Sequence, residues 1–199
     1  MSAASVSRLA TTIVLVRHGE TDWNLEGRFQ GHADTSLNAT GRTGARRLAA
    51  ELASEPVAAL YSSPLARALE TARIVGGMLD LDVRVESSLS EIDVGSWQGL
   101  TRTEIEAGHP AGYRRWLDGA AGWEHGESYE ALAARVVPAL VGIGRVHDGR
   151  VVVAVTHGGP IRAALRAARG PDARLGGGSI GNCAHVRIAI RDGEIEAVD

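Results

Sequence analysis

Short apolar runs and helical repeats alternate along this chain of 199 residues. Four short runs rich in β-branched and aliphatic residues are typical of strands buried inside a sheet. They occupy residues 13–16, 58–61, 83–85 and 151–155. Two further runs, residues 184–190 and 194–198, are separated by Asp192-Gly193 and predict a hairpin that closes the chain.

Apolar residues at helical spacing separate the strands and predict four longer helices. Their apolar faces are Ala45, Leu48, Ala49 and Leu52; Leu65, Leu69, Ala72 and Val75; Leu132, Val136, Leu140 and Ile143; and Ile161, Ala164, Leu165 and Ala168. Ser62-Ser63-Pro64 predicts the start of the second helix, with serine as N-cap and proline at the first helical position. Ser128 is the expected cap of the third helix, in which Pro138 predicts a kink or a split. Residues 95–127 are expected to form short helices.

Strands that alternate with helices predict a three-layer α/β/α sandwich with a mostly parallel central sheet. We expect a single domain over residues 12–199, preceded by a flexible lead-in over residues 1–11. In sheets of this kind ligands bind beyond the carboxyl ends of the strands, so the polar residues at those ends are the candidates for function.

Polar side chains follow each of the four predicted inner strands. Arg17-His18-Gly19 comes directly after residues 13–16, and Thr156-His157-Gly158-Gly159 directly after residues 151–155. Arg67 falls in the first turn of the helix after residues 58–61, and Glu91 lies beyond residues 83–85. We therefore expect two histidines, two arginines and one glutamate to converge at one edge of the sheet.

This set of side chains suits chemistry on a phosphate. Two guanidiniums form a clamp for an anion with several oxygens, and a neutral imidazole can attack phosphorus. A carboxyl group can protonate the leaving oxygen. Arg67, a cation in the first turn of a helix, is disfavoured by the helix dipole, which indicates an anion nearby.

The same residues resemble a known family. Residues 15–24 read LVRHGETDWN, and the similarity continues through Arg28-Phe29-Gln30-Gly31, Tyr61-Ser62-Ser63-Pro64 with Arg67 and Glu70-Thr71-Ala72, Glu91 to Gly99, and Thr156 to Gly159. In this order the segments resemble the histidine phosphatase superfamily, the phosphoglycerate-mutase-like fold, over residues 12–190. The segments GSWQGLTRTEIEAGHPAGYRRW and EHGESYEALAAR are most similar to bacterial phosphatases of the branch that includes glucosyl-3-phosphoglycerate phosphatases.

The resemblance implies roles for individual residues. His18 would be the phosphorylated nucleophile, Arg17 and Arg67 the phosphate clamp, His157 the transition-state partner and Glu91 the proton donor. Four further positions fall where the family lines the phosphate and substrate pocket: Asn24, Gln30, Gly31 and Gly158. The family uses no metal and no organic cofactor.

Several assignments stay open at this stage. Glu86 and Asp93 lie close to Glu91 and compete with it for the role of acid. The other five histidines (His32, His109, His125, His147 and His185) are expected to be surface or structural residues, although His125 is a candidate for the substrate side. Four aromatic residues belong either to the core or to the pocket wall: Trp97, Tyr113, Trp116 and Trp123. A G-x-G-x-x-G pattern at residues 176–181 precedes a strand instead of opening a helix, so it predicts a turn and no nucleotide site.

Three functions fit these residues. The first is a metal-free phosphomonoester phosphatase that acts through a phosphohistidine on a small phosphorylated metabolite. The second is a phosphoglycerate mutase, and the third is an inactive binding homologue. The short segment after Glu91 favours hydrolysis over the mutase, whereas Arg114-Arg115 in that segment are candidates for holding a second anionic group such as a carboxylate.

Composition excludes several other classes. All 21 basic residues are arginine, against 24 acidic residues, so the net charge is −3 and no lysine is available for Schiff-base or P-loop chemistry. A pI of about 6.2 argues against a nucleic-acid-binding surface. A single cysteine, Cys183, excludes an internal disulfide framework. The apolar runs are too short to span a bilayer, so we expect a cytoplasmic protein that binds no membrane, and a homodimer by base rate.

Overall fold

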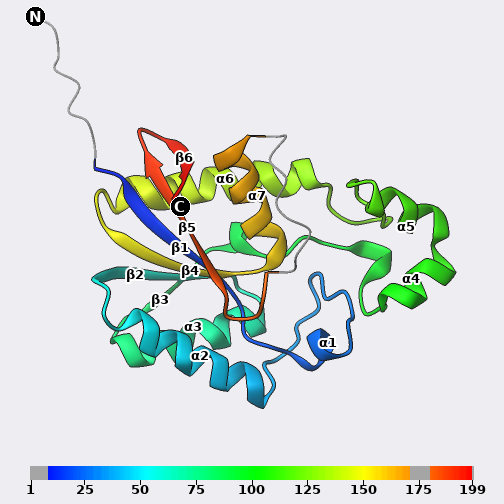
Figure 1. Cartoon of the computed structure of the whole chain (residues 1–199), viewed down its shortest axis with the longest axis horizontal. Helices are drawn as coiled ribbons and strands as arrows, with labels where there is room; N and C mark the ends of the chain where they lie inside the picture. Colours follow the sequence, from blue (N-terminus) through cyan, green and yellow to red (C-terminus); the bar gives the residue numbers. More distant parts are fainter. Residues whose placement is uncertain (1–8, 171–179, 199) are drawn as a thin grey trace, which may run out of the picture.

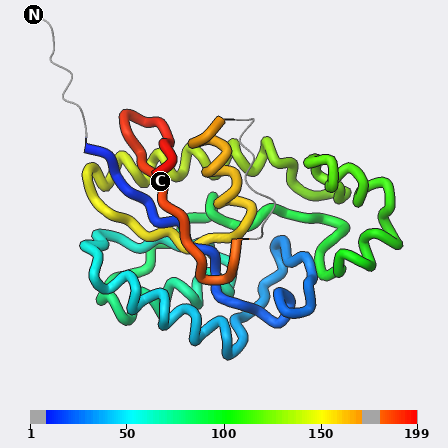
Figure 2. Tube along the Cα trace, viewed as in Figure 1, coloured from blue at the N-terminus to red at the C-terminus, as the bar shows by residue number. Residues whose placement is uncertain are grey.

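The computed structural model describes residues 9–170 and 180–198, and its centre is a sheet with the strand order β3-β2-β4-β1-β5-β6. The strands are β1 (Thr11–Arg17), β2 (Val57–Ser62), β3 (Val83–Val85), β4 (Val151–Thr156), β5 (His185–Arg191) and β6 (Glu194–Ala197). β3, β2, β4 and β1 are parallel, while β5 runs antiparallel to β1, and β6 antiparallel to β5. Figure 2 shows β1 passing between β4 and β5. The predicted mostly parallel sheet is confirmed.

Helices cover both faces of this sheet, which confirms the three-layer α/β/α prediction. Within the described residues the helices are α1 (Asp22–Leu25), α2 (Ala39–Leu52), α3 (Ala66–Leu79), α4 (Arg102–Gly108), α5 (Pro110–Leu117), α6 (Tyr129–Val146) and α7 (Gly158–Arg169). α2 and α3 lie on one face, and α6 and α7 lie on the other (Figure 1). α4 and α5 stand to one side of the sheet, in the segment expected to form short helices (Figure 1).

The period-two geometry of β1 explains its unbroken apolar sequence. Val14 and Val16 pack with Leu48 of α2 on one face, whereas Ile13 and Leu15 belong to the core on the face of α6 and α7. Successive side chains of a strand point to opposite faces, so a strand with helices on both sides needs an apolar residue at every position.

The start of α3 differs from the prediction. The helix begins at Ala66, and its N-cap residue Leu65 offers no side-chain hydrogen bond. Pro64 therefore precedes the helix and does not occupy its first position. The hydroxyl of Ser63 accepts the N–H of Leu65 at 3.3 Å, one residue before the helix, and is also bonded to Nε2 of His157 at 2.8 Å.

Pro138 does not split α6, which runs through it as one helix of 18 residues. Val136 and Leu140 on either side of Pro138 are fully buried, so the core holds both halves in line. Pro138 itself is exposed, and the carbonyl of Ala134, which loses its partner, lies on the same solvent-facing side. The split that the sequence suggested is wrong.

The glycine pattern at residues 176–181 falls largely on residues 176–179, which lie outside the described residues.

Candidate active site

The carboxyl ends of β1 and β4 and the start of α3 meet at one edge of the sheet. Arg17 ends β1, His18 follows it, His157 follows β4, and Arg67 is the second residue of α3. A cavity of about 260 Å³ opens here. Eight of the nine predicted site residues line it: Arg17, His18, Asn24, Gln30, Gly31, Arg67, Glu91 and Gly158. The ninth, His157, is fully buried behind them.

His18 is held as a neutral imidazole with one defined hydrogen. Its Nδ1 lies 2.7 Å from the carbonyl oxygen of Gly19, which can only accept, so Nδ1 carries the hydrogen and Nε2 keeps its lone pair. Burial, followed by the charges of Arg67 and Arg17, lowers the pKa of His18 well below its ordinary value. The Nε2 lone pair is therefore available at neutral pH.

The glycine after His18 is required by close packing. A Cβ on Gly19 would lie 2.7 Å from the backbone oxygen of Gly41. The Gly19 N–H donates to Oγ1 of Thr71 at 3.0 Å, and that hydroxyl donates to the carbonyl of Arg67 at 2.7 Å. These contacts tie the backbone beside His18 to α2 and to the helix that carries Arg67.

His157 lies beside His18 and is also neutral. The ring centroids are 5.1 Å apart, with an angle of 56° between the planes. Burial and the charge of Arg67 lower the pKa of His157 well below its ordinary value. Its Nε2 is bonded to the Ser63 hydroxyl, while its buried Nδ1 has no hydrogen-bond partner among the described residues.

Arg67 is a buried cation held by carbonyl oxygens. Its two terminal nitrogens donate to Ala33 at 2.7 Å and to Gly31 at 2.8 Å, and its Nε has no partner within the described ranges. Burial lowers its pKa to about 10. Arg17 donates to the carbonyl of Ile180, and burial lowers its pKa too. A buried guanidinium without a bonded carboxylate favours an anion in the cavity.

Glu91 is the carboxylate that reaches the cavity. Its Oε1 accepts the N–H groups of Ile92 at 2.9 Å and of Gly159 at 3.0 Å, at the first turn of α7. Its two competitors are engaged locally, because Glu86 accepts the N–H of Ser88 and Asp93 accepts that of Gly95, both at 2.9 Å. The structure thereby separates the three carboxylates that the sequence left open.

The pocket lining also contains residues that sequence reasoning missed. Arg28 and Arg162 line the cavity. Asn182 lies outside this lining but supports two of its residues, because it donates to the backbone oxygen of His18 at 3.1 Å and to Oδ1 of Asn24 at 3.0 Å. Arg162 lies four residues after Gly158 and hence on the same face of α7, a spacing that could have identified it. Asn182 carries no local signal, since its contacts span more than 150 residues of sequence.

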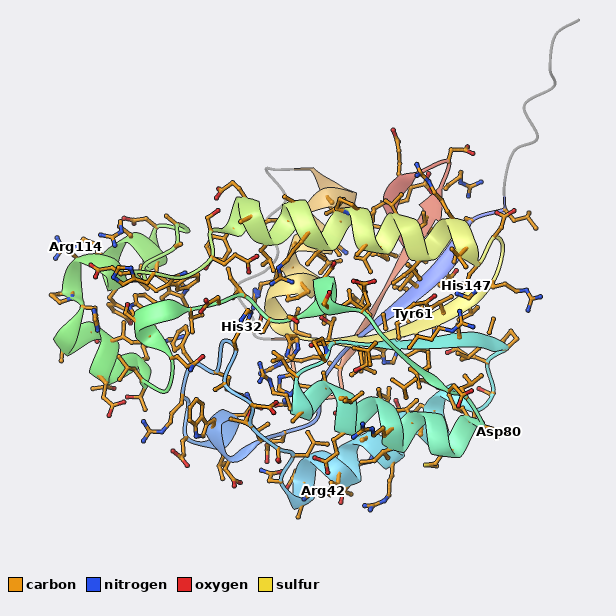
Figure 3. All side chains as sticks on the ribbon, turned by 180° about the vertical axis from the view of Figure 1, so that it is seen from behind. His32, Arg42, Tyr61, Asp80, Arg114 and His147 are labelled. Atoms are coloured by element: carbon orange, nitrogen blue, oxygen red, sulfur yellow. The ribbon has the colours of Figure 1, made fainter. Side chains whose placement is uncertain are left out.

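Arg114 and Arg115 do not reach the cavity. Both are exposed on α5, and Figure 3 places Arg114 at the outer edge of the molecule. Arg115 donates to the carbonyl of Gly122 at 3.1 Å. Trp116 of the same helix lines the cavity instead, so the structure does not place these two candidates where they could hold a second anionic group of the substrate.

The aromatic residues divide between core and wall. Trp116 and Trp123 line the cavity, as does Tyr129 of α6. Trp97 is fully buried in the core, and Tyr113 is half-buried and stacks on Trp116 with centroids 6.0 Å apart.

The five remaining histidines are not in the pocket lining. His125 is exposed in the left-handed backbone region, with φ of 57°, and does not take the substrate-side position considered for it. His32 is exposed but bonds to the backbone of Glu91 at 2.8 Å, a structural role close to the site. The others are His109 at the junction of α4 and α5, His147 bonded to Tyr61, and His185 in β5.

The family model described as "Histidine phosphatase superfamily (branch 1)" matches residues 13–199. The chain belongs to the histidine phosphatase superfamily. It is 41% identical over 167 residues to the phosphoglycerate mutase-like protein 4 of Arabidopsis thaliana, covering 81% of this chain and 72% of that protein. It is 42% identical over 159 residues to the metal-independent phosphoserine phosphatase of the same plant, covering 77% and 66%. Relatives of this superfamily member thus include plant proteins.

Its fold also matches solved structures of the superfamily. The mycobacterial glucosyl-3-phosphoglycerate phosphatase in complex with VO₃ superposes with a TM-score of 0.82 and 34% sequence identity, over 91% of this chain and 97% of that one. Together with the family match, these similarities identify the chain as a phosphoric monoester hydrolase and favour the phosphatase over the mutase. Among the described residues, no helix has the length and apolar character needed to cross a membrane.

Proposed function

We propose that this histidine phosphatase hydrolyses phosphomonoesters of small metabolites in two steps through a phosphohistidine on His18. One observation carries the proposal: the Nε2 lone pair of a neutral His18 lies in a cavity shared with Arg17 and Arg67, two guanidiniums bonded to carbonyl oxygens. A nucleophile is thereby placed where the anion binds.

In the first step the Nε2 lone pair attacks phosphorus and the bond from phosphorus to the alcohol oxygen breaks. Arg17 and Arg67 bind the phosphoryl oxygens, and His157 stabilises their charge in the transition state. Glu91, protonated, donates its proton to the leaving oxygen, so a neutral alcohol departs. The Nδ1–H bond to the Gly19 carbonyl supports the positive charge that develops on the phosphorylated ring.

In the second step water attacks the phosphohistidine. The Glu91 carboxylate takes a proton from that water, the bond from phosphorus to Nε2 breaks, and inorganic phosphate leaves. His18 is again neutral and Glu91 again protonated, so the cycle is closed without a metal or an organic cofactor.

The substrate class follows from the residues around the clamp. Asn24, Gln30, Gly31 and Gly158 are proposed to contact the phosphate and the substrate. Arg162 adds a positive charge to the lining, which also contains Trp116 and Tyr129, whereas the charge of Arg28 is paired with Glu26 and Glu104. A small phosphate ester that bears a carboxylate fits this charge. The similarity to phosphatases named for phosphoserine and for glucosyl-3-phosphoglycerate supports the same class.

The test is phosphate release from a panel of phosphomonoesters in EDTA, run beside a mutase assay with 3-phosphoglycerate. We expect hydrolysis that EDTA leaves unchanged and little isomerisation. Loss of turnover in EDTA would exclude the metal-free mechanism, and isomerisation faster than phosphate release would favour the mutase. Tight binding of an ester without turnover would favour an inactive binding homologue.

We further propose that the enzyme is cytoplasmic, of bacterial origin and a homodimer. Its one cysteine supports a reducing compartment, and a two-fold dimer is the commonest assembly among soluble homo-oligomers. Light scattering of the purified protein tests the dimer directly.

A further inference from the structure

The segment that carries Glu91 is held by side chains instead of by a neighbouring strand. Between β3 and the loop at Glu91, four consecutive backbone carbonyls each accept a hydrogen bond from a side chain: those of Ser88, Leu89, Ser90 and Glu91. Oγ1 of Thr156 supplies the bond to Leu89 at 2.6 Å. Arg135 of α6 supplies the other three.

Arg135 uses all five of its N–H donors. Its Nη1 donates to the carbonyls of Ser88 at 2.8 Å and of Ser90 at 2.9 Å, and its Nη2 donates to the carbonyl of Glu91 at 2.9 Å. The remaining two donors bind the Glu127 carboxylate, with Nε to Oε1 at 2.7 Å and Nη2 to Oε2 at 2.8 Å. A guanidinium has five donors in a rigid fork, so this set leaves none of them unused.

Hydrogen bonds consequently fix both the backbone and the side-chain carboxylate of Glu91. Its backbone carbonyl accepts from Arg135 and from His32, and its carboxylate accepts from Ile92 and Gly159. Figure 3 shows His32 on the loop beside this segment. Arg135 does not line the cavity, so it does not act on the substrate directly.

We propose that Arg135, oriented by Glu127, is a positioning residue that sets the reach of the Glu91 carboxyl toward the leaving oxygen. The inference rests on the proposed role of Glu91 as proton donor. The hydrogen bonds from Arg135 take the place of the strand pairing that this segment lacks. They hold the backbone at Glu91 in a fixed position relative to α6. Without the hydrogen bonds from Arg135, the backbone carbonyls of Ser88, Ser90 and Glu91 would bond to water instead. The loop would then no longer hold the Glu91 carboxyl at one distance from the reacting atoms.

The test compares two esters that differ in their need for an acid. p-Nitrophenyl phosphate releases a stable phenolate, whereas glycerol 3-phosphate releases an alkoxide that must be protonated. The quantity to measure is kcat/KM, because it reports the steps up to departure of the alcohol. We expect Arg135→Gln to lower kcat/KM about 10- to 100-fold for glycerol 3-phosphate and less than about 3-fold for p-nitrophenyl phosphate, since a general acid contributes about 10²- to 10⁴-fold.

Arg135→Lys separates geometry from charge. Lysine keeps the positive charge, but one ammonium cannot reach three carbonyls and a carboxylate, so this variant should show the same leaving-group dependence. Wild-type activity in Arg135→Lys would reduce the role of Arg135 to its charge and overturn the proposal. If Arg135→Gln does not fold, Glu127→Gln carries the same test, because it weakens the orientation of the guanidinium and leaves the packing in place.

Two controls separate the outcomes. Arg187→Gln removes another half-buried arginine, which pairs with Glu55 far from the site, and should leave both esters unaffected. Glu91→Gln must show the leaving-group dependence in full; an equal loss for both esters there would refute the acid role itself. If Glu91→Gln shows it and the Arg135 variants slow both esters equally or neither, the positioning role alone is refuted.

Discussion

The ring centroids of His18 and His157 lie 5.1 Å apart, and both rings are buried within the electrostatic influence of Arg17 and Arg67. Burial first, and then the charge of each arginine, lowers the pKa of both imidazoles, so the histidines stay neutral and the positive charge of the site belongs to the arginines. The division is chemically useful, because a protonated His18 could not attack phosphorus.

Replacement of the nucleophile should abolish turnover. We expect His18→Ala to lower kcat at least about 10³-fold, as removal of a covalent nucleophile does in other enzymes. Phosphate release measures the loss, and labelling with a ³²P ester followed by an alkaline quench should detect an acid-labile phosphoprotein in the wild type only. His185→Ala, on β5, is the control. Hydrolysis retained by His18→Ala would place the nucleophile elsewhere.

Stability should fall on the acid side of pH 6.5. Both buried histidines have a folded-state pKa well below their ordinary value of 6.5, so below that pH the unfolded chain binds protons that the folded protein does not. The free energy of unfolding should therefore decrease by about 1.4 kcal/mol per pH unit for each histidine as pH falls from 6.5 toward the folded-state pKa values. Above pH 6.5 this contribution is constant.

Urea unfolding at a series of pH values, in buffer without phosphate, measures this slope. In His18→Gln the slope of the unfolding free energy against pH should fall by the contribution of one histidine, about 1.4 kcal/mol per pH unit. An unchanged slope in the variant would mean that His18 is protonated in the folded protein.

Two adjacent glycines of α7 should differ in their tolerance of a methyl group. A Cβ on Gly159 would overlap with Oε1 of Glu91, the flexible end of a side chain, whereas a Cβ on Gly158 comes no closer than 4.0 Å to Oε2. We expect Gly159→Ala to displace Glu91 and lower kcat for an alkyl phosphate about 10- to 100-fold, with little change in thermal stability.

Gly158 is proposed to contact the phosphate, so any loss in Gly158→Ala should be the same for an alkyl phosphate and for p-nitrophenyl phosphate. In Gly159→Ala the loss should be larger for the alkyl phosphate, whose leaving oxygen needs the acid. Equal losses for the two esters in Gly159→Ala would show that the contact between Gly159 and Glu91 does not control the acid.

Arg162 should select substrates with a second anionic group. Arg162→Gln is expected to raise KM for phosphoserine or 3-phosphoglycerate about 10-fold, the typical effect of one lost charge-assisted hydrogen bond. KM for an uncharged alkyl phosphate should change far less. Arg114→Gln, on α5 at the outer edge of the molecule, is the matched control. An effect of Arg114→Gln larger than that of Arg162→Gln would contradict the geometry.

The sequence by itself determined the layers and most of the pocket. Unbroken apolar runs at β1 and β4 required helices on both faces, and the parallel sheet this implies brings the carboxyl ends of its strands to one edge. His18, His157, Arg17 and Arg67 follow from that rule, because each stands within a few residues of a strand end.

Only the tertiary structure decided how these side chains are supported. The hydrogen bonds from Arg135 to the Glu91 segment and from Asn182 to His18 join residues that are 44 to 164 positions apart in the sequence. The outward direction of Arg114 depends on the orientation of the short helix α5 against the core. Local periodicity reports which face of an element is buried. It carries no information about which distant donor meets a given carbonyl, since that follows from the packing of all layers together.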